Sequence, residues 1–187
     1  MKPHTYFKAT RLPWTLAGSG LEGAELVDSP DVPDVDALVH AVLTLDSVDA
    51  FRPRFSAQDW RVVRDYMVRR TVAAGAVLIV QGDSDRRAFL LESGALVVRT
   101  IRADGSGSRI ALLRAGALVG EPALFGETVR MAQVDAIARC VVWSLARQRL
   151  DVLRRGHPDL AHEILRAAGA VMAERMRANL ALGTPVL

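Results

Sequence analysis

The sequence predicts a mainly β fold, a barrel or sandwich of short strands, with helices on either side of it. Between residues 69 and 145, short apolar runs are separated by Gly, Asp and Ser, which is typical of strands joined by tight turns. Before and after this region, apolar residues recur every three or four positions, which indicates amphipathic helices. The expected parts are an irregular tail at 1–33, a helical element at 34–68, the β region at 69–147 and C-terminal helices at 148–187.

Composition restricts the class of protein. The chain has 187 residues, half of them apolar, and no apolar run reaches the roughly eighteen residues needed to cross a membrane. Its first residues carry charge without an apolar segment behind them, so they are not a secretory signal. Cys140 is the only cysteine, which excludes an internal disulfide framework and favours a cytoplasmic protein. The formal net charge is only +3 and the arginines are dispersed, so we expect no DNA partner.

Two helices are expected between the tail and the strands. Proline and glycine interrupt every period in the tail, which predicts irregular structure there. The stretch 34–51 has helical spacing, and Pro53 then breaks the chain. Ser56 and the residues up to Asp59 resemble a capping box, which predicts that a second helix begins there. The apolar positions of the two helices are Val35, Leu38, Val39, Val42 and Leu45, then Trp60, Val63, Tyr66 and Met67.

The β region divides into short runs with clear turn signals. Residues 82–85 read as a turn, Ser93 and Gly94 form a tight turn between two strands, and 103–108 has the composition of a hairpin loop. The expected strands are 71–72, 76–81, two within 88–98, 109–113, 133–140 and 141–145, and residues 115–119 lead into the stretch described below.

The C-terminal part predicts a short helix at 148–155 that stops at Gly156, and then a long helix from Pro158 to about residue 182. The apolar positions of the long helix cover more than one narrow stripe, so one side can pack on the β region and the other on a second copy of the chain. The alternative is that the whole stripe is intramolecular core. These positions are Leu160, Ile164, Leu165, Ala168, Val171, Met172, Met176 and Leu180.

The stretch 119–132 carries the chemistry. Glu121 to Phe125 suits a short helical turn, because Pro122 would lie in its first turn, where a missing N–H costs nothing. The start of such a turn presents free backbone N–H groups to a phosphate. Arg130 offers a planar, permanently charged donor for the same anion, and Glu121 offers acceptors for sugar hydroxyls. Together these groups can hold a small ribose phosphate.

This stretch resembles the phosphate-binding cassette of the cyclic-nucleotide-binding domain family, which runs Gly-Glu-x-Ala/Gly-Leu, a short loop, and Arg-Ser/Thr/Ala-Ala. Met131 departs from the pattern, since many members carry Ser or Thr there, and Val119 stands where many carry Phe. The resemblance extends over about residues 50–182 and is to the sensory domain of catabolite-activator-type regulators and of protein kinase A regulatory subunits. The matching residues are Gly82, Asp83, Phe89, Leu91 and Gly94, then Gly120, Glu121, Ala123, Leu124, Arg130 and Ala132.

The resemblance implies an antiparallel β-barrel of the double-stranded β-helix or jelly-roll type, and it implies roles for single residues. Glu121 would bind the ribose 2′-hydroxyl, and Arg130 the cyclic phosphate together with the backbone N–H groups of Met131 and Ala132. The last helix would place a polar side chain against the purine, either Arg175 or Asn179, one helical turn apart. The expected binding residues are Gly120, Glu121, Pro122, Ala123, Arg130, Met131, Ala132, Arg175 and Asn179.

The function that the resemblance implies is that of a sensor. It would bind cyclic AMP or cyclic GMP and signal to a partner protein by moving its flanking helices, without catalysis and without a cofactor. No helix-turn-helix follows the last helix, which predicts a free-standing sensory domain. A metal site within the barrel is not expected, because all four histidines, at positions 4, 40, 157 and 162, lie outside it. The alternative, favoured by Met131 and Val119, is a structural or protein-interaction module that no longer binds a ligand.

Overall fold

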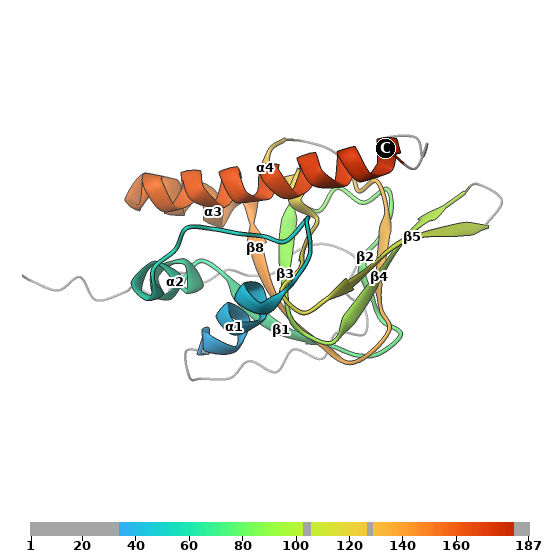
Figure 1. Cartoon of the computed structure of the whole chain (residues 1–187), viewed down its shortest axis with the longest axis horizontal. Coiled ribbons are helices and arrows are strands. Elements are labelled where there is room, and N and C mark those ends of the chain that lie inside the picture. Colours follow the sequence, from blue (N-terminus) through green and yellow to red (C-terminus); the bar gives the residue numbers. More distant parts are fainter. Residues whose placement is uncertain (1–33, 103–105, 127–128, 182–187) are drawn as a thin grey trace, which may run out of the picture.

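The computed structural model describes residues 34–102, 106–126 and 129–181, so the predicted tail lies outside the described residues. Among these residues, two short helices, α1 (Asp36–Thr44) and α2 (Ala57–Arg64), precede eight strands. A single 3₁₀ turn, η1 (Glu121–Leu124), follows the sixth strand. The helices α3 (Arg147–Gly156) and α4 (Pro158–Ala181) complete the order shown in Figure 1. The predicted class, strands flanked by helices with one long helix at the end, is confirmed.

The eight strands form two antiparallel sheets of four. The first sheet has the order β1, β8, β3, β6, and the second has the order β2, β7, β4, β5. No hydrogen-bonded ladder joins the two sheets within the described residues, so the jelly roll is a sandwich with open edges. The strands are β1 (Val68–Val72), β2 (Val77–Ile79), β3 (Arg87–Ser93), β4 (Ala95–Ile101), β5 (Gly107–Arg114), β6 (Leu118–Val119), β7 (Gln133–Ala136) and β8 (Cys140–Ala146).

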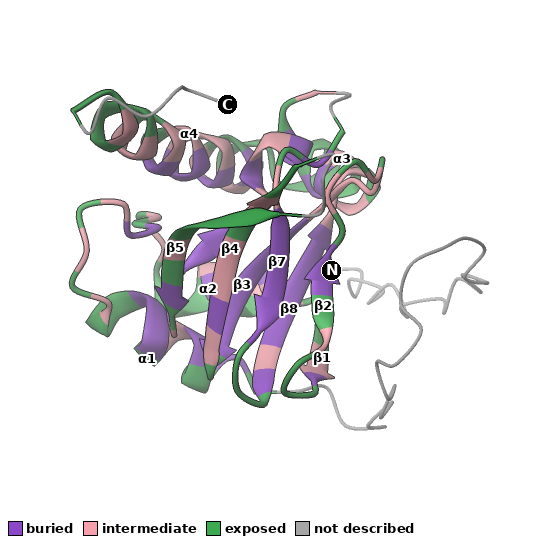
Figure 2. Cartoon of the chain, turned by 90° about the vertical axis from the view of Figure 1, so that its right-hand side faces the viewer, coloured by how far each residue is buried: buried purple, intermediate pink, exposed green. Residues whose placement is uncertain are grey.

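Strand β3 separates two hydrophobic cores. Its side chains alternate, so that Phe89 and Leu91 point between the two sheets while Ala88 and Leu90 point toward the helices. Both faces of this strand are therefore buried from Ala88 to Glu92, and the part of β3 that is visible in Figure 2 is purple. The core between the sheets forms one side of the cavity described below.

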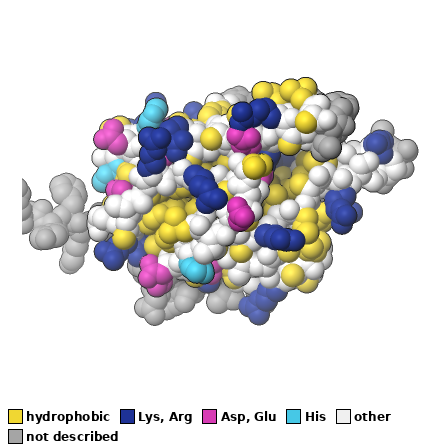
Figure 3. Space-filling view, viewed as in Figure 1, with side chains coloured by type: hydrophobic (Ala, Val, Ile, Leu, Met, Phe, Trp, Pro, Cys, Tyr) yellow, Lys and Arg dark blue, Asp and Glu magenta, His cyan; other side chains and the backbone are white. Residues whose placement is uncertain are grey.

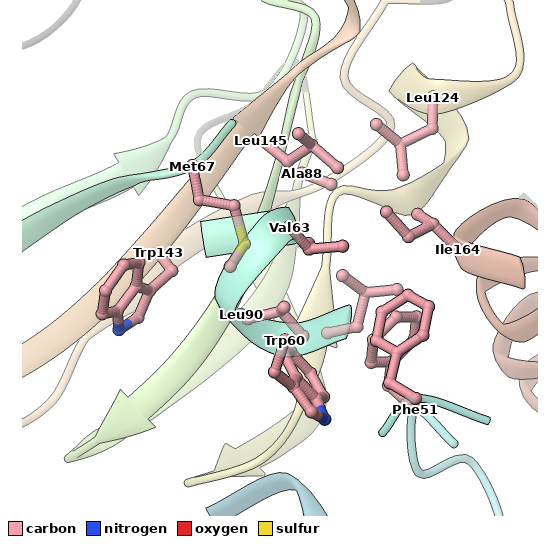
Figure 4. Close-up of a pocket in the computed structure, with 12 residues that line it drawn as sticks. Phe51, Trp60, Val63, Met67, Ala88, Leu90, Leu124, Trp143, Leu145 and Ile164 are labelled. Atoms are coloured by element: carbon pink, nitrogen blue, oxygen red, sulfur yellow. The ribbon is translucent and has the colours of Figure 1, made fainter. Parts of the chain in front are cut away.

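The helices pack on the outer face of the first sheet. Figure 4 shows Trp60 and Val63 of α2 facing Leu90 of β3 and Ile164 of α4. The residues around this point are apolar and leave a gap of about 20 Å³. A space of that size holds at most one water molecule, and it offers that water no polar partner. We therefore regard it as a packing gap between helices and sheet.

The second predicted helix is confirmed and the first is shorter than expected. In α2, Ser56 Oγ accepts a hydrogen bond from Asp59 N, and Ser56 N donates to the Asp59 carboxylate, which is the predicted capping box. In contrast, α1 ends at Thr44, and the chain then runs in non-helical conformation to residue 56. Ser47 donates a hydrogen bond to Asp49, and such local bonds of short polar side chains compete with helix formation.

The boundary between the last two strands was predicted in the wrong place. Strand β7 ends at Ala136, and Cys140 begins β8, where it pairs with Val72 of β1. The turn lies at 137–139, and the apolar but exposed Ile137 concealed it in the sequence. Cys140 is fully buried, and burial raises the pKa of its thiol, as expected for an inert core cysteine.

Helix α4 runs across one end of the two sheets (Figures 1 and 2). Its first half is buried through Ala161, Ile164, Ala168 and Val171, whereas Met176 in its second half is exposed. In residues 34–102, 106–126 and 129–181 we find no helix whose length and hydropathy suit a membrane span.

Candidate ligand-binding site

A cavity of about 400 Å³ lies between the second half of α4, the turn η1 and the inner faces of the strands. In Figure 3 the surface is hollowed below α4, beside the β4–β5 hairpin, and apolar side chains gather there. Ile79, Val98, Leu113, Val119 and Val134 supply much of this apolar wall. The residues predicted to bind a ligand all line the cavity, namely Gly120, Glu121, Pro122, Ala123, Arg130, Met131, Ala132, Arg175 and Asn179.

Gly120 allows the chain to turn from β6 into η1. Its φ of 77° lies in the left-handed region, which side chains other than glycine adopt only with strain. A Cβ at this position would lie 2.8 Å from Arg130 Nη1 and 3.0 Å from the backbone oxygen of Arg87. Pro122 lies in the first turn of η1, as predicted. Gly120 therefore places Glu121 and leaves room for the Arg130 guanidinium.

Arg130 is the buried cation of the site, with a side chain only 6% exposed. Nη1 donates to Gly120 O at 3.3 Å, and Nη2 donates to the backbone oxygen of Arg87 and, at 3.2 Å, to Asp85 Oδ2. The buried Nε–H has no hydrogen-bond partner among the described residues. The guanidinium is thus held in place while one of its donors remains unsatisfied, which is costly unless an acceptor arrives.

Asp85 was not predicted as part of the site, although it orients Arg130. Its carboxylate also accepts hydrogen bonds from Arg87 Nε, at 2.8 Å and 3.0 Å. Two guanidinium groups against one carboxylate leave this group with a net positive charge, which favours an anion nearby. The sequence offered only a weak signal, since Asp85 belongs to the polar turn at 82–85 that precedes β3.

Backbone donors follow Arg130 in the chain. Arg130 N donates to Asp83 O at 2.8 Å, and Gly82 N donates to Arg130 O at 2.8 Å, so this segment is anchored. The next two backbone N–H groups, of Met131 and Ala132, have no partner among the described residues. Unpaired N–H groups beside a fixed arginine suit a phosphate. The Met131 side chain, 44% exposed, lines the cavity but adds no hydroxyl.

Glu121 is buried and paired with the last helix. Glu121 is only 5% exposed, and its Oε1 accepts a hydrogen bond from Arg175 Nη1 at 2.7 Å. Arg175 Nη2 also donates to Leu118 O at 2.9 Å. The second carboxylate oxygen of Glu121, Oε2, has no hydrogen-bond partner among the described residues. One oxygen is thus used to orient the carboxylate, and the other can accept a bond from a ligand hydroxyl.

Arg175 has a second acidic partner that sequence reasoning missed. Its Nε donates to Asp49 Oδ2 at 2.8 Å, and Asp49 lies in the segment between α1 and α2. Burial lowers the pKa of Arg175, but the charges of Glu121 and Asp49 more than offset this and hold it above its ordinary value. Burial likewise opposes ionisation of Asp49, yet the bonds from Ser47 and Arg175 keep its pKa below the usual range. Arg175 is therefore a fixed cation between two carboxylates.

The two candidates for contact with a purine differ in their surroundings. Arg175 is held by Glu121, Asp49 and Leu118, whereas Asn179, one turn further along α4, lines the cavity with no side-chain hydrogen bond to the described residues. Asn179 is thus the freer of the two to pair with a base edge. Among the described residues, no group of three or more His, Cys, Asp or Glu side chains is arranged to hold a metal ion.

Comparison with known proteins finds a matching family and similar sequences. Residues 69–157 match the model of the cyclic nucleotide-binding domain family. The chain is 30% identical over 112 residues to the cyclic AMP receptor protein of Thermus thermophilus, a match that covers 60% of this chain and 50% of that protein. It is 37% identical over 81 residues to the cAMP-dependent protein kinase regulatory subunit of Blastocladiella emersonii, covering 43% of this chain and 20% of that protein.

The fold is also similar to that of a cyclic nucleotide-binding domain from Methylobacillus flagellatus KT whose crystal structure is known. The TM-score is 0.67 at 22% sequence identity, and the match covers 76% of this chain and 78% of the other. The chain spans half of the Thermus protein and a fifth of the kinase subunit, so these relatives contain parts with no counterpart in the match.

Proposed function

We propose, because residues 69–157 belong to the cyclic nucleotide-binding domain family, that this chain is a sensor that binds a cyclic mononucleotide. The observation that carries the proposal is that a buried, partly unsatisfied Arg130 and a buried Glu121 line the same cavity of about 400 Å³. No part of this role requires catalysis. The sensor would pass its signal to a partner protein by moving its flanking helices.

Each polar group of the site has a place in this proposal. The cyclic phosphate would lie against Arg130, where the Arg130 Nε–H and the backbone N–H groups of residues 131 and 132 have no acceptor in the part of the chain that the structure describes. The ribose 2′-hydroxyl would donate to Glu121 Oε2, while Arg175 holds Oε1. The base would then lie toward α4, where Asn179 offers both a donor and an acceptor. The apolar strand faces would cover the rest of the purine and sugar.

Cyclic AMP is the proposed ligand among the cyclic nucleotides. The names of two relatives support this choice, since one is a cyclic AMP receptor and the other a regulatory subunit of a cAMP-dependent kinase. Asn179 is chemically compatible, because an amide side chain can pair with the donor and acceptor of an adenine edge. Cyclic GMP is the nearest competitor for the same cavity.

We also propose that α4 can pair with α4 of a second copy of the chain. Met176 is 48% exposed and Leu180 is 61% exposed on this helix, and such exposed apolar residues on a long helix favour association. Analytical ultracentrifugation of the wild type and of a Met176→Glu, Leu180→Glu variant tests this. A dimer that persists unchanged in the variant would place the interface elsewhere.

A second candidate function is a module on the same fold that binds no nucleotide. Two observations favour it: Met131 supplies no hydroxyl to a phosphate, and Arg130 already has three internal acceptors. This candidate and the sensor make opposite predictions about ligand binding, so one experiment separates them.

Isothermal titration calorimetry of the full chain with cyclic AMP, cyclic GMP and a cyclic dinucleotide is that experiment. If the chain is a sensor, cyclic AMP should bind saturably and one-to-one, and cyclic GMP should bind more weakly. The larger cyclic dinucleotide should not bind. Absence of heat with all three ligands would leave the non-binding module as the function.

A further inference from the structure

The segment 45–56, which connects α1 to α2, lies alongside α4 as an extended strap (Figure 1). We call it the α1–α2 strap. It lies outside the residues that match the family model, which begin at 69, as does Arg175. The strap nevertheless meets α4 at two places, and only one of the two is beside the cavity.

The first attachment lies near the start of α4, away from the cavity. Glu163 Oε1 accepts a hydrogen bond from Arg54 N at 2.6 Å, and Arg166 Nη2 donates to Arg52 O at 2.8 Å. Glu163 and Arg166 also form an ion pair with each other at 2.7 Å. Because these bonds use the strap backbone and a matched pair of charges, they fix this end of the strap to α4.

The second attachment is made by Arg175 through Asp49, and it includes the cavity. The two side chains lie 2.8 Å apart, and each is about a quarter exposed. Arg175 also holds Glu121, so one guanidinium joins the strap to the carboxylate that faces the ligand site. Val48, next to Asp49, lines the cavity but is 84% exposed, so it stands at the cavity's rim with little to pack against.

We propose that the α1–α2 strap closes over an occupied cavity, and that Asp49 is the positioning residue that couples it to the site by holding Arg175. This inference rests on the proposed function, since it requires a nucleotide in the cavity. Occupancy gives Glu121 a second hydrogen bond and gives Val48 a surface to cover. Both changes favour the closed strap, and a ligand shifts such an equilibrium only by its differential affinity for the two arrangements.

Movement of the strap on ligand binding would then be transmitted to α1. The strap is fixed to α4 at Arg52 and Arg54, so a change at Asp49 is confined to the part between that anchor and α1. Helix α1 precedes the strap, and it packs against β3 with Leu38, Ala41 and Val42 buried. A shift of the strap would therefore reposition α1, which offers a partner protein a surface that depends on the ligand.

Hydrogen exchange of the full chain with and without cyclic AMP tests this inference in four proteins. These are the wild type, Asp49→Asn, Asp49→Glu and the control Asp46→Asn, which removes a charge from an exposed position in the same strap. In the wild type and the control, cyclic AMP should slow exchange of the amides at 46–51. In Asp49→Asn, calorimetry should show binding weakened by no more than about fivefold, the size of one partly exposed ion pair, while the strap amides no longer respond. Asp49→Glu should restore part of the response.

The outcomes separate this inference from the function on which it rests. Binding by the wild type without slower exchange at 46–51 would overturn the inference alone. A response of Asp49→Asn as full as that of the wild type would also overturn it, because Asp49 would then not couple the strap to the site. No binding of cyclic AMP by the wild type in calorimetry would overturn the proposed function, and the inference with it.

Discussion

Arg175 of α4 and Glu121 of η1 lie 54 positions apart in sequence, and their side chains meet at 2.7 Å beside the cavity. The contact connects the turn η1 to the helix α4 at the edge of the cavity that both of them line. Because Glu121 is almost fully buried, the loss of one partner would leave an uncompensated charge. The pair therefore fixes the direction of the Glu121 carboxylate before any ligand arrives.

The first prediction concerns the free oxygen of Glu121. If it accepts a bond from the ribose, 2′-deoxy cyclic AMP should bind the wild type more weakly than cyclic AMP by roughly 1.5–3 kcal/mol, as expected for a hydrogen bond to a charged group. Glu121→Gln should reduce this difference, and calorimetric titration of both ligands against both proteins measures it. Equal discrimination by the two proteins would show that Glu121 does not contact the ribose.

The second prediction concerns Arg130. Arg130→Ala should remove on the order of 2–5 kcal/mol of the binding free energy for cyclic AMP, because the phosphate would lose its buried cation. The fold should persist, since Asp85 keeps its bonds from Arg87. Arg109→Ala, at an exposed position of β5, is the control and should bind as the wild type does. Unchanged affinity in Arg130→Ala would place the phosphate elsewhere.

The sequence predicted those structural features that depend on patterns of neighbouring residues. Alternating apolar runs and turn residues indicated the strands, and a capping box located α2 because its two partners are only three residues apart. The stretch from Gly120 to Ala132 could be interpreted as a site for the same reason, since the residues that line the cavity there are nearly contiguous. Local signals fix local structure, and here much of the site is local.

What the sequence could not predict depends on contacts between distant segments. Asp49 meets Arg175 across 126 positions, and Asp85 meets Arg130 across 45, and neither carboxylate belongs to a pattern that marks it. The end of α1 was missed because Leu45 continues the helical spacing although its backbone is extended. The different surroundings of Arg175 and Asn179 were also invisible in the sequence, because only the structure shows that Asp49, Glu121 and Leu118 hold Arg175.

The third prediction tests the need for glycine at position 120. Gly120→Ala should destabilise the fold by about 1–2 kcal/mol, because the left-handed conformation is unfavourable for alanine. It should also weaken cyclic AMP binding, since the new methyl group would meet Arg130 Nη1 at 2.8 Å. Gly126→Ala is the matched control, because a Cβ there has no atom within 4 Å. Urea unfolding and calorimetry of both variants measure the two effects. Similar behaviour of the two variants would contradict the role assigned to Gly120.

The fourth prediction concerns pH and the anchored end of the strap. The hydrogen bonds from Arg166 and from Arg54 N lower the pKa of Glu163 from 4.5 to about 2. A carboxyl whose pKa is lower in the folded state stabilises the fold at pH values above its unfolded pKa, and this contribution is lost as pH falls toward the folded pKa. The free energy of unfolding should therefore decrease between about pH 4.5 and pH 2, in part through Glu163.

Glu163→Gln should flatten this decrease, because the variant has no proton to gain at that position. Urea unfolding at several pH values within the window compares it with the wild type and with Asp46→Asn, whose position is exposed. A variant with the same pH dependence as the wild type would show that Glu163 does not contribute to acid sensitivity.

The last prediction concerns how ligand binding in the cavity would change the hydrogen exchange of α4. Arg175 and Asn179 both line the cavity from the second half of this helix, whereas its first half is buried against the sheet and the other helices. Backbone amides in the first half of α4 should therefore exchange hydrogen slowly whether or not a ligand is present. A nucleotide that binds Glu121 and Asn179 would order the second half, so the amides from Val171 to Leu180 should slow in cyclic AMP, together with those from Gly120 to Ala132. The buried segment of α4 from Ala161 to Ala168 serves as the internal control. Protection restricted to 120–132 would mean that the helix does not respond, and the signal would then have to leave through the N-terminal helices alone.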